Sequence, residues 1–420
     1  MTSNALGLTR GEYWKGVYSL EPFIEKDEMR KRLTFVIQLT KGVLAESGEH
    51  IEGRYHKKRK AVHDEYVKVT NHIDKGQSAY EIVGLDVGGA EKYYRPEVFA
   101  HTLRAAKKEG LRTTYHVGED FYDIVDGMRA VWEIIQFTES CTVDRLGHCM
   151  ALGMNPEHYY KDGCNLSMPR QVMLDNVVWL CCFAKEKGIG ISRHLSESLK
   201  TLAEDLYRKT GYGRYFERLD MNDYYESMLL RSDEGYQSDG LDVWSKTEVL
   251  KSPRAIKARD NDNALDLNRA YRYDKKVIEN GEDMEYREMH ESYSKLVGKV
   301  QQKMIEMIRA KEICIEACPS SNLQICKLES YKHHPAIRYY IDRGKCWLWG
   351  FFKRPELNLA ICTDDKGTFS TSLVNEFSLL AAAATNGRGM SRNVEIKFKS
   401  LITKGHEKRF EPKTIERWRP

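Results

Sequence analysis

The sequence lacks several patterns that would assign it at once to a well-defined class. It has no run of 18 apolar residues, so we expect no membrane-spanning segment. Its first twenty residues lack a basic stretch followed by an apolar one, which argues against a secretory signal. None of its ten cysteines forms a C-x-x-C pair, which argues against a zinc ribbon or a thioredoxin-type site. We therefore expect a cytoplasmic protein with free, buried thiols.

The charge balance gives no support for a nucleic-acid partner. The chain has 66 Lys and Arg against 62 Asp and Glu, and the two signs are interspersed. It contains no P-loop that would hold nucleotide phosphates. The stretch from Lys397 to Pro420 is basic, and we interpret it as a solvated tail. We expect no membrane partner, and the charge balance argues against a nucleic acid without excluding one.

Short apolar runs alternate along the chain with longer helical patterns. The runs are nearly continuous, which is typical of strands buried on both faces of a parallel sheet. Residues 96–110 open with Pro and close with Gly, as a helix does, and 123–137 have helical spacing. This rhythm predicts a parallel α/β fold, and 420 residues suit a (β/α)8 TIM barrel with insertions. The predicted strands are 32–40, 80–87, 111–117, 142–148, 312–318 and 357–363.

The alternation stops between about residues 156 and 310, a region rich in charge and tyrosine. We predict a helical insertion there. The chain then divides into three parts: the N-terminal part of a barrel at 1–155, the insertion at 156–310, and the C-terminal part of the barrel with its basic tail at 311–420. The pattern leaves open whether the insertion is a separate domain or a lid.

Polar side chains follow the predicted strands. In a barrel the C-terminal ends of the strands meet at one mouth, which is where active sites lie. Each residue has an ordinary explanation by itself, such as a turn, a helix cap or a structural histidine. Their occurrence on successive strands favours a site, since His and carboxylate suit a catalytic zinc and Glu and His suit proton transfer. The candidates are Gly89, His116, Glu119, His148, Asp364 and Asp365.

Four motifs resemble those of adenosine deaminases and stand in that family's order: HVGE, RLGH, ACPSSN and CTDDKGTFSTSLVNEF. VGLDVGGAE resembles the glycine-bearing strand end that precedes them. The resemblance covers roughly residues 30–155 and 310–390. The long insertion also resembles the deaminase-like subunit of the RADAR phage-defence system, which would imply a role in antiviral defence.

The resemblance implies zinc-dependent hydrolytic deamination of adenosine, or of another adenine nucleoside or nucleotide, to the inosine product and ammonia. It also implies a role for each candidate residue. His116 and Asp364 would bind the metal, Glu119 would protonate purine N1, His148 would lie beside the attacking hydroxide, Asp365 would meet N7, and the Gly89 backbone would meet N3.

One departure from the family is marked. Adenosine deaminases begin with a strand ending in His-x-His, which supplies two more zinc ligands, and this sequence contains no H-x-H. It also has only six recognisable barrel strands, so we expect a barrel incomplete at its N-terminus. The missing segment could lie upstream, or a second chain or a second copy could supply it. Two other interpretations stay open: a non-catalytic assembly or regulatory subunit, and another metal-dependent amidohydrolase or phosphoesterase.

Overall fold

The computed structural model describes residues 34–42, 53–74, 81–138, 143–233, 252–326, 328–337, 357–385 and 392–410. Within them, six strands form one sheet in the order β1-β2-β3-β4-β7-β8, and every neighbouring pair is parallel. The strands are β1 (Thr34–Thr40), β2 (Glu81–Gly88), β3 (Arg112–Val117), β4 (Arg145–His148), β7 (Cys314–Ala317) and β8 (Asn358–Ile361). All six predicted strands are thus confirmed.

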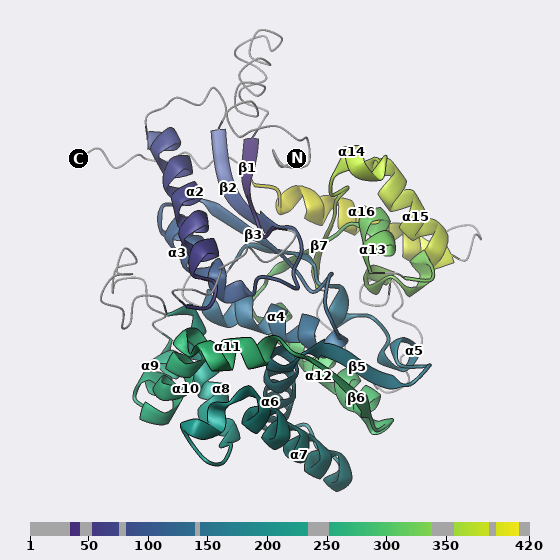
Figure 1. Ribbon diagram of the computed structural model, residues 1–420. Coiled ribbons are helices and arrows are strands. Elements are labelled where there is room, and N and C mark those ends of the chain that lie inside the picture. The colour runs from purple at the N-terminus through teal and green to yellow at the C-terminus, as the bar shows by residue number, and fades with distance from the viewer. Residues whose placement is uncertain are drawn as a thin grey trace.

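The sheet is open in the described part of the chain. Strands β1 and β8 lie at its two edges, and no described strand joins them into a ring. The α/β class and the parallel sheet agree with the sequence analysis, whereas the closure into an eight-stranded barrel stays a prediction. Figure 1 shows α2 (His56–Asp74) and α3 (Ala100–Lys108) on one side of the sheet, with the C-terminal helices on the other.

Helix α4 (Ile124–Phe137) lies between the sheet and the insertion (Figure 1). Asp123 caps its N-terminus, where the side chain accepts a hydrogen bond from the Val125 N–H, as expected for a residue that satisfies a free backbone donor. Every residue of α4 is buried, because the sheet covers one face and the insertion covers the other. On that second face, Trp132 packs against Trp179 of the insertion, with ring centroids 6.3 Å apart.

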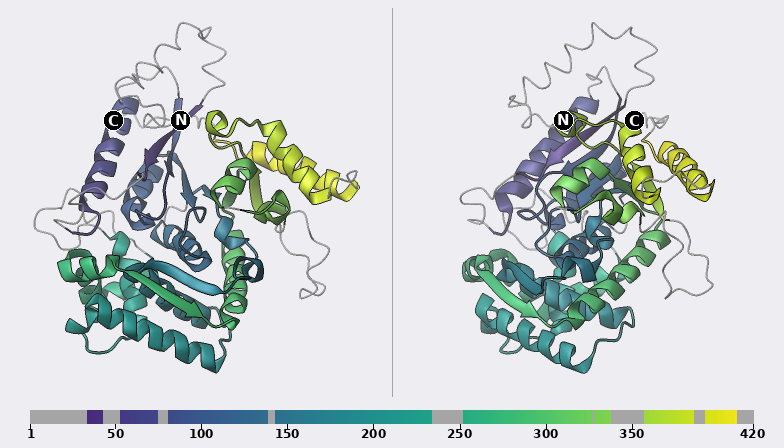
Figure 2. Two further views of the ribbon diagram at one scale, coloured as in Figure 1. Left: turned by 45° about the vertical axis from the view of Figure 1, so that its right-hand side comes forward. Right: turned by 90° about the vertical axis from the view of Figure 1, so that its right-hand side faces the viewer.

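Residues 149–313 form a single connection between β4 and β7, which are neighbours in the sheet. The described part of this connection is mainly helical, and Figure 2 shows most of its helices, in teal and green, packed together at the bottom of both views. None of the described helices is long and apolar enough to cross a membrane. The described helices of the connection between β4 and β7 are α5 (Pro156–Tyr159), α6 (Arg170–Glu186), α7 (Arg193–Thr210), α8 (Met221–Leu229), α9 (Pro253–Arg259), α10 (Asp262–Tyr273), α11 (Lys275–Glu282) and α12 (Ser292–Ala310).

The insertion, predicted as helical, also contains two strands. Strands β5 (Cys164–Pro169) and β6 (Met284–Met289) pair antiparallel within it. Strand β5 alternates between buried and exposed residues, the pattern of a strand with one face in the core. It lies more than a hundred residues from its partner in the sequence, so no local hairpin signal announces the pair.

The C-terminal region also differs from the prediction. Residues 397–407 belong to helix α16 (Arg392–Glu407) rather than to a solvated tail. Phe398 and Leu401 are buried because their three-residue spacing puts both on one face, which packs along β8. The tail residues 411–420 lie outside the described residues. The other helices here are α13 (Pro319–Ile325), α14 (Lys366–Phe369) and α15 (Leu373–Thr385).

Candidate active site

The candidate site begins where β3 ends, in a turn that aims Glu119 inward. Gly118 takes a left-handed conformation with φ +73°. The Glu91 carboxylate accepts hydrogen bonds from the N–H groups of Gly118 at 2.6 Å and Glu119 at 3.1 Å. This buried carboxylate fixes the turn, because it satisfies two backbone donors that water cannot reach.

His116 and His148 lie side by side because β3 and β4 pair in register. Gly147 stands opposite His116, and His148 stands opposite Val117. The two imidazole rings meet edge to face with centroids 4.7 Å apart, and His148 Nε2 lies 3.4 Å from His116 Nδ1. Position 147 must be glycine for this contact, because a Cβ there would come within 2.8 Å of His116 Cδ2.

The other nitrogen of His116 meets a carboxylate. Its Nε2 lies 3.2 Å from Asp86 Oδ2, which also accepts a hydrogen bond from Gln38 Nε2 at 2.7 Å. Burial by itself would lower the pKa of His116, but the Asp86 charge outweighs it and raises the pKa to about 9. Asp86 thus orients the ring, as carboxylates behind metal-binding histidines do.

Asn322 links Glu119 to His148. Its Nδ2 donates to Glu119 Oε1 and contacts His148 Nδ1 at 2.8 Å. Its Oδ1 accepts from the Cys318 N–H at 3.0 Å and lies 3.1 Å from His334 Nε2. All these polar groups are buried, so they hold one another in place.

Burial sets the charge states of these groups. Burial raises the pKa of Glu119 to about 7, so the carboxyl exists in both forms near neutral pH. Burial, together with the neighbouring positive His116, lowers the pKa of His148 to about 4. Burial likewise lowers the pKa of His334 to about 3. His148 and His334 are therefore neutral near pH 7, and they lie close to the Glu119 carboxyl, which can donate a proton.

Asp364 lies across the site from Glu119, just after β8. The Ser321 hydroxyl donates to its Oδ2 at 2.6 Å and lies 3.5 Å from Glu119 Oε1. His148 and Asp364 both have left-handed backbone conformations, with φ of +66° and +54°. Such conformations cost about 1 kcal/mol or more in residues other than glycine, and they cluster at functional sites.

The donors around Asp364 suit a metal ion. Ligand atoms of His148, Cys318 and Asp364 lie within 4.8 Å of one another in the described part of the chain. Nitrogen, sulfur and carboxylate oxygen are the ligands that zinc takes in proteins. His116 borders this group through His148, but its Nε2 faces Asp86. The donors therefore fit zinc, although the assignment of His116 and Asp364 as its ligands stays a prediction.

The two candidate substrate-binding residues both lie beyond the C-terminal ends of sheet strands, Gly89 after β2 and Asp365 after β8. Gly89 follows β2 with φ +108° and is exposed. The Asp365 carboxylate accepts from the Thr368 N–H at 3.2 Å and from the Thr368 hydroxyl at 2.8 Å, so it caps α14 in this structure. The structure leaves their proposed contacts with a purine as predictions.

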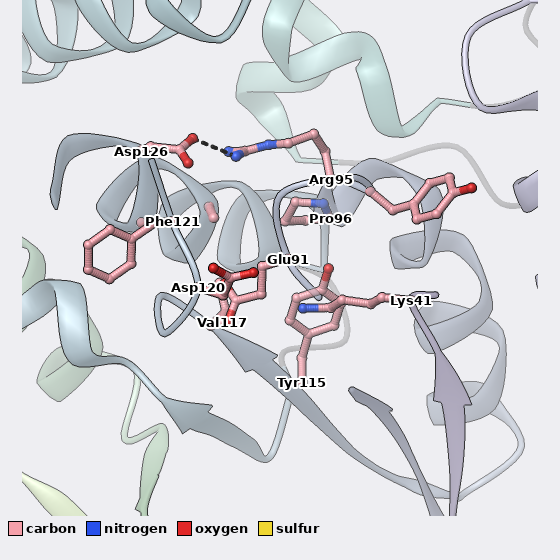
Figure 3. A pocket seen from close by; sticks show the side chains of 12 residues that line it. Lys41, Glu91, Arg95, Pro96, Tyr115, Val117, Asp120, Phe121 and Asp126 are labelled. Atoms are coloured by element: carbon pink, nitrogen blue, oxygen red, sulfur yellow. Dashed lines mark hydrogen bonds and ion pairs between the residues drawn. The ribbon is translucent and has the colours of Figure 1, made fainter. Parts of the chain in front are cut away.

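A small pocket lies behind the Glu119 turn (Figure 3). Lys41, which directly follows β1, is buried there, and its Nζ donates to the His116 carbonyl and lies 4.4 Å from the centre of the Tyr115 ring. Figure 3 shows Lys41 and Glu91 in this pocket below the Arg95–Asp126 ion pair, whose N–O distance is 2.7 Å. Burial lowers the pKa of Lys41, and the nearby Glu91 and Asp86 oppose this effect.

Sequence reasoning assigned no role to several residues that build the site. Ser321 and Asn322 stood inside the ACPSSN motif, and Asp86 and Glu91 inside VGLDVGGAE, so the motifs carried the signal. His334 had no such signal. It stands outside every motif, and the structure places its Nε2 3.1 Å from Asn322 Oδ1.

Comparison with known proteins gives partial matches. No protein-family model matches the sequence. Adenosine deaminase 1 of Streptomyces coelicolor is 28% identical over 132 residues, which cover 31% of this chain and 28% of that relative. An adenosine deaminase of Shewanella halifaxensis is 33% identical over 76 residues, which cover 18% of this chain and 19% of that relative. The chain therefore matches less than a third of the length of either relative.

Among solved structures, an adenine deaminase from Arthrobacter aurescens aligns with 83% of this chain and 58% of its own, at 11% identity and a TM-score of 0.31. That score is too low to carry an argument about the fold. The sequence matches and the order of the site residues along successive strands are the better guide. Parts of this chain are therefore similar in sequence to adenosine deaminases.

Proposed function

We propose that this site catalyses the zinc-dependent hydrolytic deamination of adenosine or of another adenine nucleoside or nucleotide. The observation that carries the proposal is the buried Glu119 carboxyl, held by Asn322 beside His148 and raised in pKa to about 7. Purine deamination needs a proton donor for ring nitrogen N1 at neutral pH, and a carboxyl with this pKa can act as one.

The residues of the chain divide the work of the reaction. Protonated Glu119 donates to N1, which makes C6 more open to attack. Neutral His148 accepts a proton from the water whose oxygen bonds to C6, and passes it to the amino group. The C6–N bond then breaks, ammonia leaves, and the remaining hydroxyl proton returns to Glu119 as the C6 carbonyl forms. Zinc held by His116 and Asp364 would supply Lewis-acid activation of that water. The Gly89 backbone and the Asp365 side chain would orient the ring through N3 and N7.

We further propose that the two remaining family ligands come from a segment that pairs with the edge of the sheet. Strand β8 lies at one edge and carries Asp364 directly beyond its end, so a strand added beside it would bring its C-terminal residues next to Asp364. The segment could belong to the same polypeptide or to a second chain. Catalytic zinc sites usually have three protein ligands, and His116 and Asp364 are only two. The two ligands of the added segment would make up this deficit.

The absence of H-x-H favours a second candidate function, a non-catalytic assembly subunit that keeps the deaminase-like site. A third, another metal-dependent amidohydrolase or phosphoesterase, fits the site less well, because a proton-donating Glu beside paired aspartates suits a purine edge better than a phosphate. Activity with phosphoesters, and none with adenine compounds, would favour the third candidate.

The test is zinc content together with conversion of adenosine, AMP and ATP to their inosine products, measured on this chain. We expect bound zinc and turnover, either from this chain alone or once the H-x-H segment is supplied. Glu119→Gln should then lower turnover by about 100-fold or more while zinc content stays constant, because the variant loses a proton donor and no ligand. Glu288→Gln, at an exposed position on β6, is the matched control and should behave as wild type.

Two outcomes would contradict the proposal. Zinc binding without turnover of any adenine compound would favour the assembly subunit. Near-normal turnover by Glu119→Gln would remove Glu119 from the role of proton donor. If the chain alone shows neither zinc nor turnover, adding the upstream segment or a partner chain with an H-x-H strand should restore both, and failure to do so would reject the enzyme hypothesis.

A further inference from the structure

A second group of metal-binding side chains lies outside the candidate active site. It consists of His158 on α5, Glu329 in the segment after α13, and His333 at the end of the short 3-10 helix η8 (Tyr331–His333). Ligand atoms of the three lie within 4.8 Å of one another. His158 Nε2 is 3.0 Å from Glu329 Oε2, and the two imidazole rings are 4.8 Å apart between centroids.

Local structure brings each side chain to this place. Asn155 caps α5 through the N–H groups of Glu157 and His158, and Pro156 fixes its first turn. The His333 N–H donates to the Ser330 carbonyl at 3.0 Å, which holds the turn that presents its ring. Two imidazoles so close together would repel each other if both were protonated, whereas a shared cation would turn that contact into an attraction.

We infer that His158, Glu329 and His333 form a binding site for zinc or a similar divalent transition metal, separate from the active site. Two imidazole nitrogens and one carboxylate oxygen make a common zinc ligand set, with water in the fourth position. Bonds of about 2.1 Å in a tetrahedral site put ligand atoms about 3.4 Å apart, so small side-chain rotations are enough to close the group. Two of the three side chains are exposed, which leaves room for them.

One neighbouring charge opposes metal binding. Lys161 Nζ donates to Glu329 Oε1, the carboxylate oxygen that does not face His158. The carboxylate can serve both groups because each uses a different oxygen. The lysine nonetheless places a positive charge near the cation, so its removal should tighten zinc binding.

The metal would join two parts of the molecule that meet at the active site. Helix α5 belongs to the insertion, whereas residues 329–334 belong to the connection that follows β7. His334, directly after the ligand His333, is buried against Asn322, which contacts both Glu119 and His148. A metal at this site would therefore hold the segment that supports the proton-donating group.

Zinc binding tests this inference directly. The protein, freed of metal, is titrated with Zn²⁺ alone against a competing chelator, and hydrogen exchange of residues 329–337 is followed with and without zinc. We expect one zinc equivalent that His158→Ala and His333→Ala each abolish, that Lys161→Ala tightens, and that Asp364→Ala leaves in place. Zinc should slow exchange of 329–337 in wild type and in Asp364→Ala, but not in His158→Ala.

A matched control comes from another surface histidine pair. His194 and His290 have ring centroids 5.1 Å apart but do not belong to either metal-binding group in the described part of the chain. His194→Ala should keep the zinc equivalent. The inference fails if His158→Ala and His333→Ala bind as much zinc as wild type, or if His194→Ala loses as much as they do. The readout is zinc stoichiometry, so it does not depend on whether the active site deaminates purines.

Discussion

At the scale of single residues, the site depends on an amide that has no charge of its own. Asn322 touches Glu119, His148 and His334, and its hydrogen bond to Glu119 lowers the pKa of that carboxyl against the stronger effect of burial. We therefore regard Asn322 as a positioning residue. It sets both where Glu119 points and the pH at which it holds a proton.

This role predicts a shift in the pH profile. The pKa of Glu119 is about 7 in the folded protein, so the proton-donating form is lost, and turnover falls, as pH rises through about 7. In Asn322→Ala the bond that lowers this pKa is gone, so the alkaline limb of kcat/KM should move to higher pH while the maximal rate falls. Measurements of kcat/KM from pH 5 to 9, at intervals of about half a pH unit, would check this shift.

Gln324→Ala is the control for this experiment, because Gln324 lies exposed on the same short helix. It should leave both the limb and the rate unchanged. A lower rate in Asn322→Ala with an unmoved limb would mean that Asn322 supports the fold and does not tune Glu119.

At the scale of elements, strand pairing decides which side chains meet. The register of β3 against β4 sets Gly147 beneath His116, and the glycine leaves the space that the imidazole fills. A one-residue slip would turn these side chains to the opposite face of the sheet. The site is therefore as precise as the register.

Gly147→Ala tests this dependence. The new Cβ would lie 2.8 Å from His116 Cδ2, too close for any real contact, so the ring or the strand must move. We expect a loss of about 1–3 kcal/mol in the free energy of unfolding, together with loss of activity. Gly190→Ala is the control, since a Cβ there meets nothing within 4 Å. Equal stability of the two variants by urea denaturation would show that the crowding is relieved without cost.

The sequence predicted those elements whose signal is local. All six sheet strands are short apolar runs, and burial on both faces makes such runs visible without knowledge of their partners. Strands β5 and β6 were not predicted, because only pairing across the whole insertion makes Cys164–Pro169 a strand. The part of α16 from Lys397 onward was not predicted as a helix, because its lysines make the sequence basic and leave only the apolar pair Phe398 and Leu401 as a sign of a buried face.

The site was predicted only as far as its motifs reached. His116 and His148 lie at the ends of β3 and β4, and Glu119 and Asp364 follow β3 and β8, so the four side chains lie in one region of the parallel sheet while their roles stay predictions. Lys41 and His334 could not be foreseen in the same way. Their places depend on tertiary contacts with another element. Lys41 donates to the main-chain carbonyl of His116, and His334 lies against the side chain of Asn322.

At the scale of the whole molecule, buried ion pairs join the sheet layer to the insertion. Asp175 on α6 accepts two hydrogen bonds from Arg231, at 2.6 and 2.8 Å, and one from the Tyr224 hydroxyl at 2.8 Å. Its Oδ2 also lies 3.6 Å from Arg129 on α4. The cluster fixes α4 to the insertion, and it is costly to break because Arg231 would stay buried without its counter-charge.

Asp175→Ala should therefore destabilise the protein by about 3–5 kcal/mol. Asp266→Ala, which removes an exposed pair with Arg269, should cost no more than about 1 kcal/mol. Urea denaturation of both variants measures the difference. Similar losses in the two would show that the buried cluster contributes little to holding the layers together.

The same carboxylate gives stability a defined pH dependence. Burial would raise the pKa of Asp175, but Arg231 lowers it to about 2 in the folded protein. The unfolded chain binds this proton more readily, so the stabilisation is present above pH of about 4 and is lost as pH falls toward 2. Asp175→Ala should remove this part of the acid sensitivity.

The placement of the insertion between β4 and β7 has a consequence for the order of folding. His148 and Cys318, whose ligand atoms lie within 4.8 Å of each other, flank the whole of residues 149–313 in the chain. Closing so long a loop costs only about 0.6 kcal/mol more for each doubling of its length, but it makes the contact slow to find. An insertion that folds first brings its two ends together and shortens that search. The candidate active site would then be the last part of the protein to assemble, because it lies between two units that are already folded.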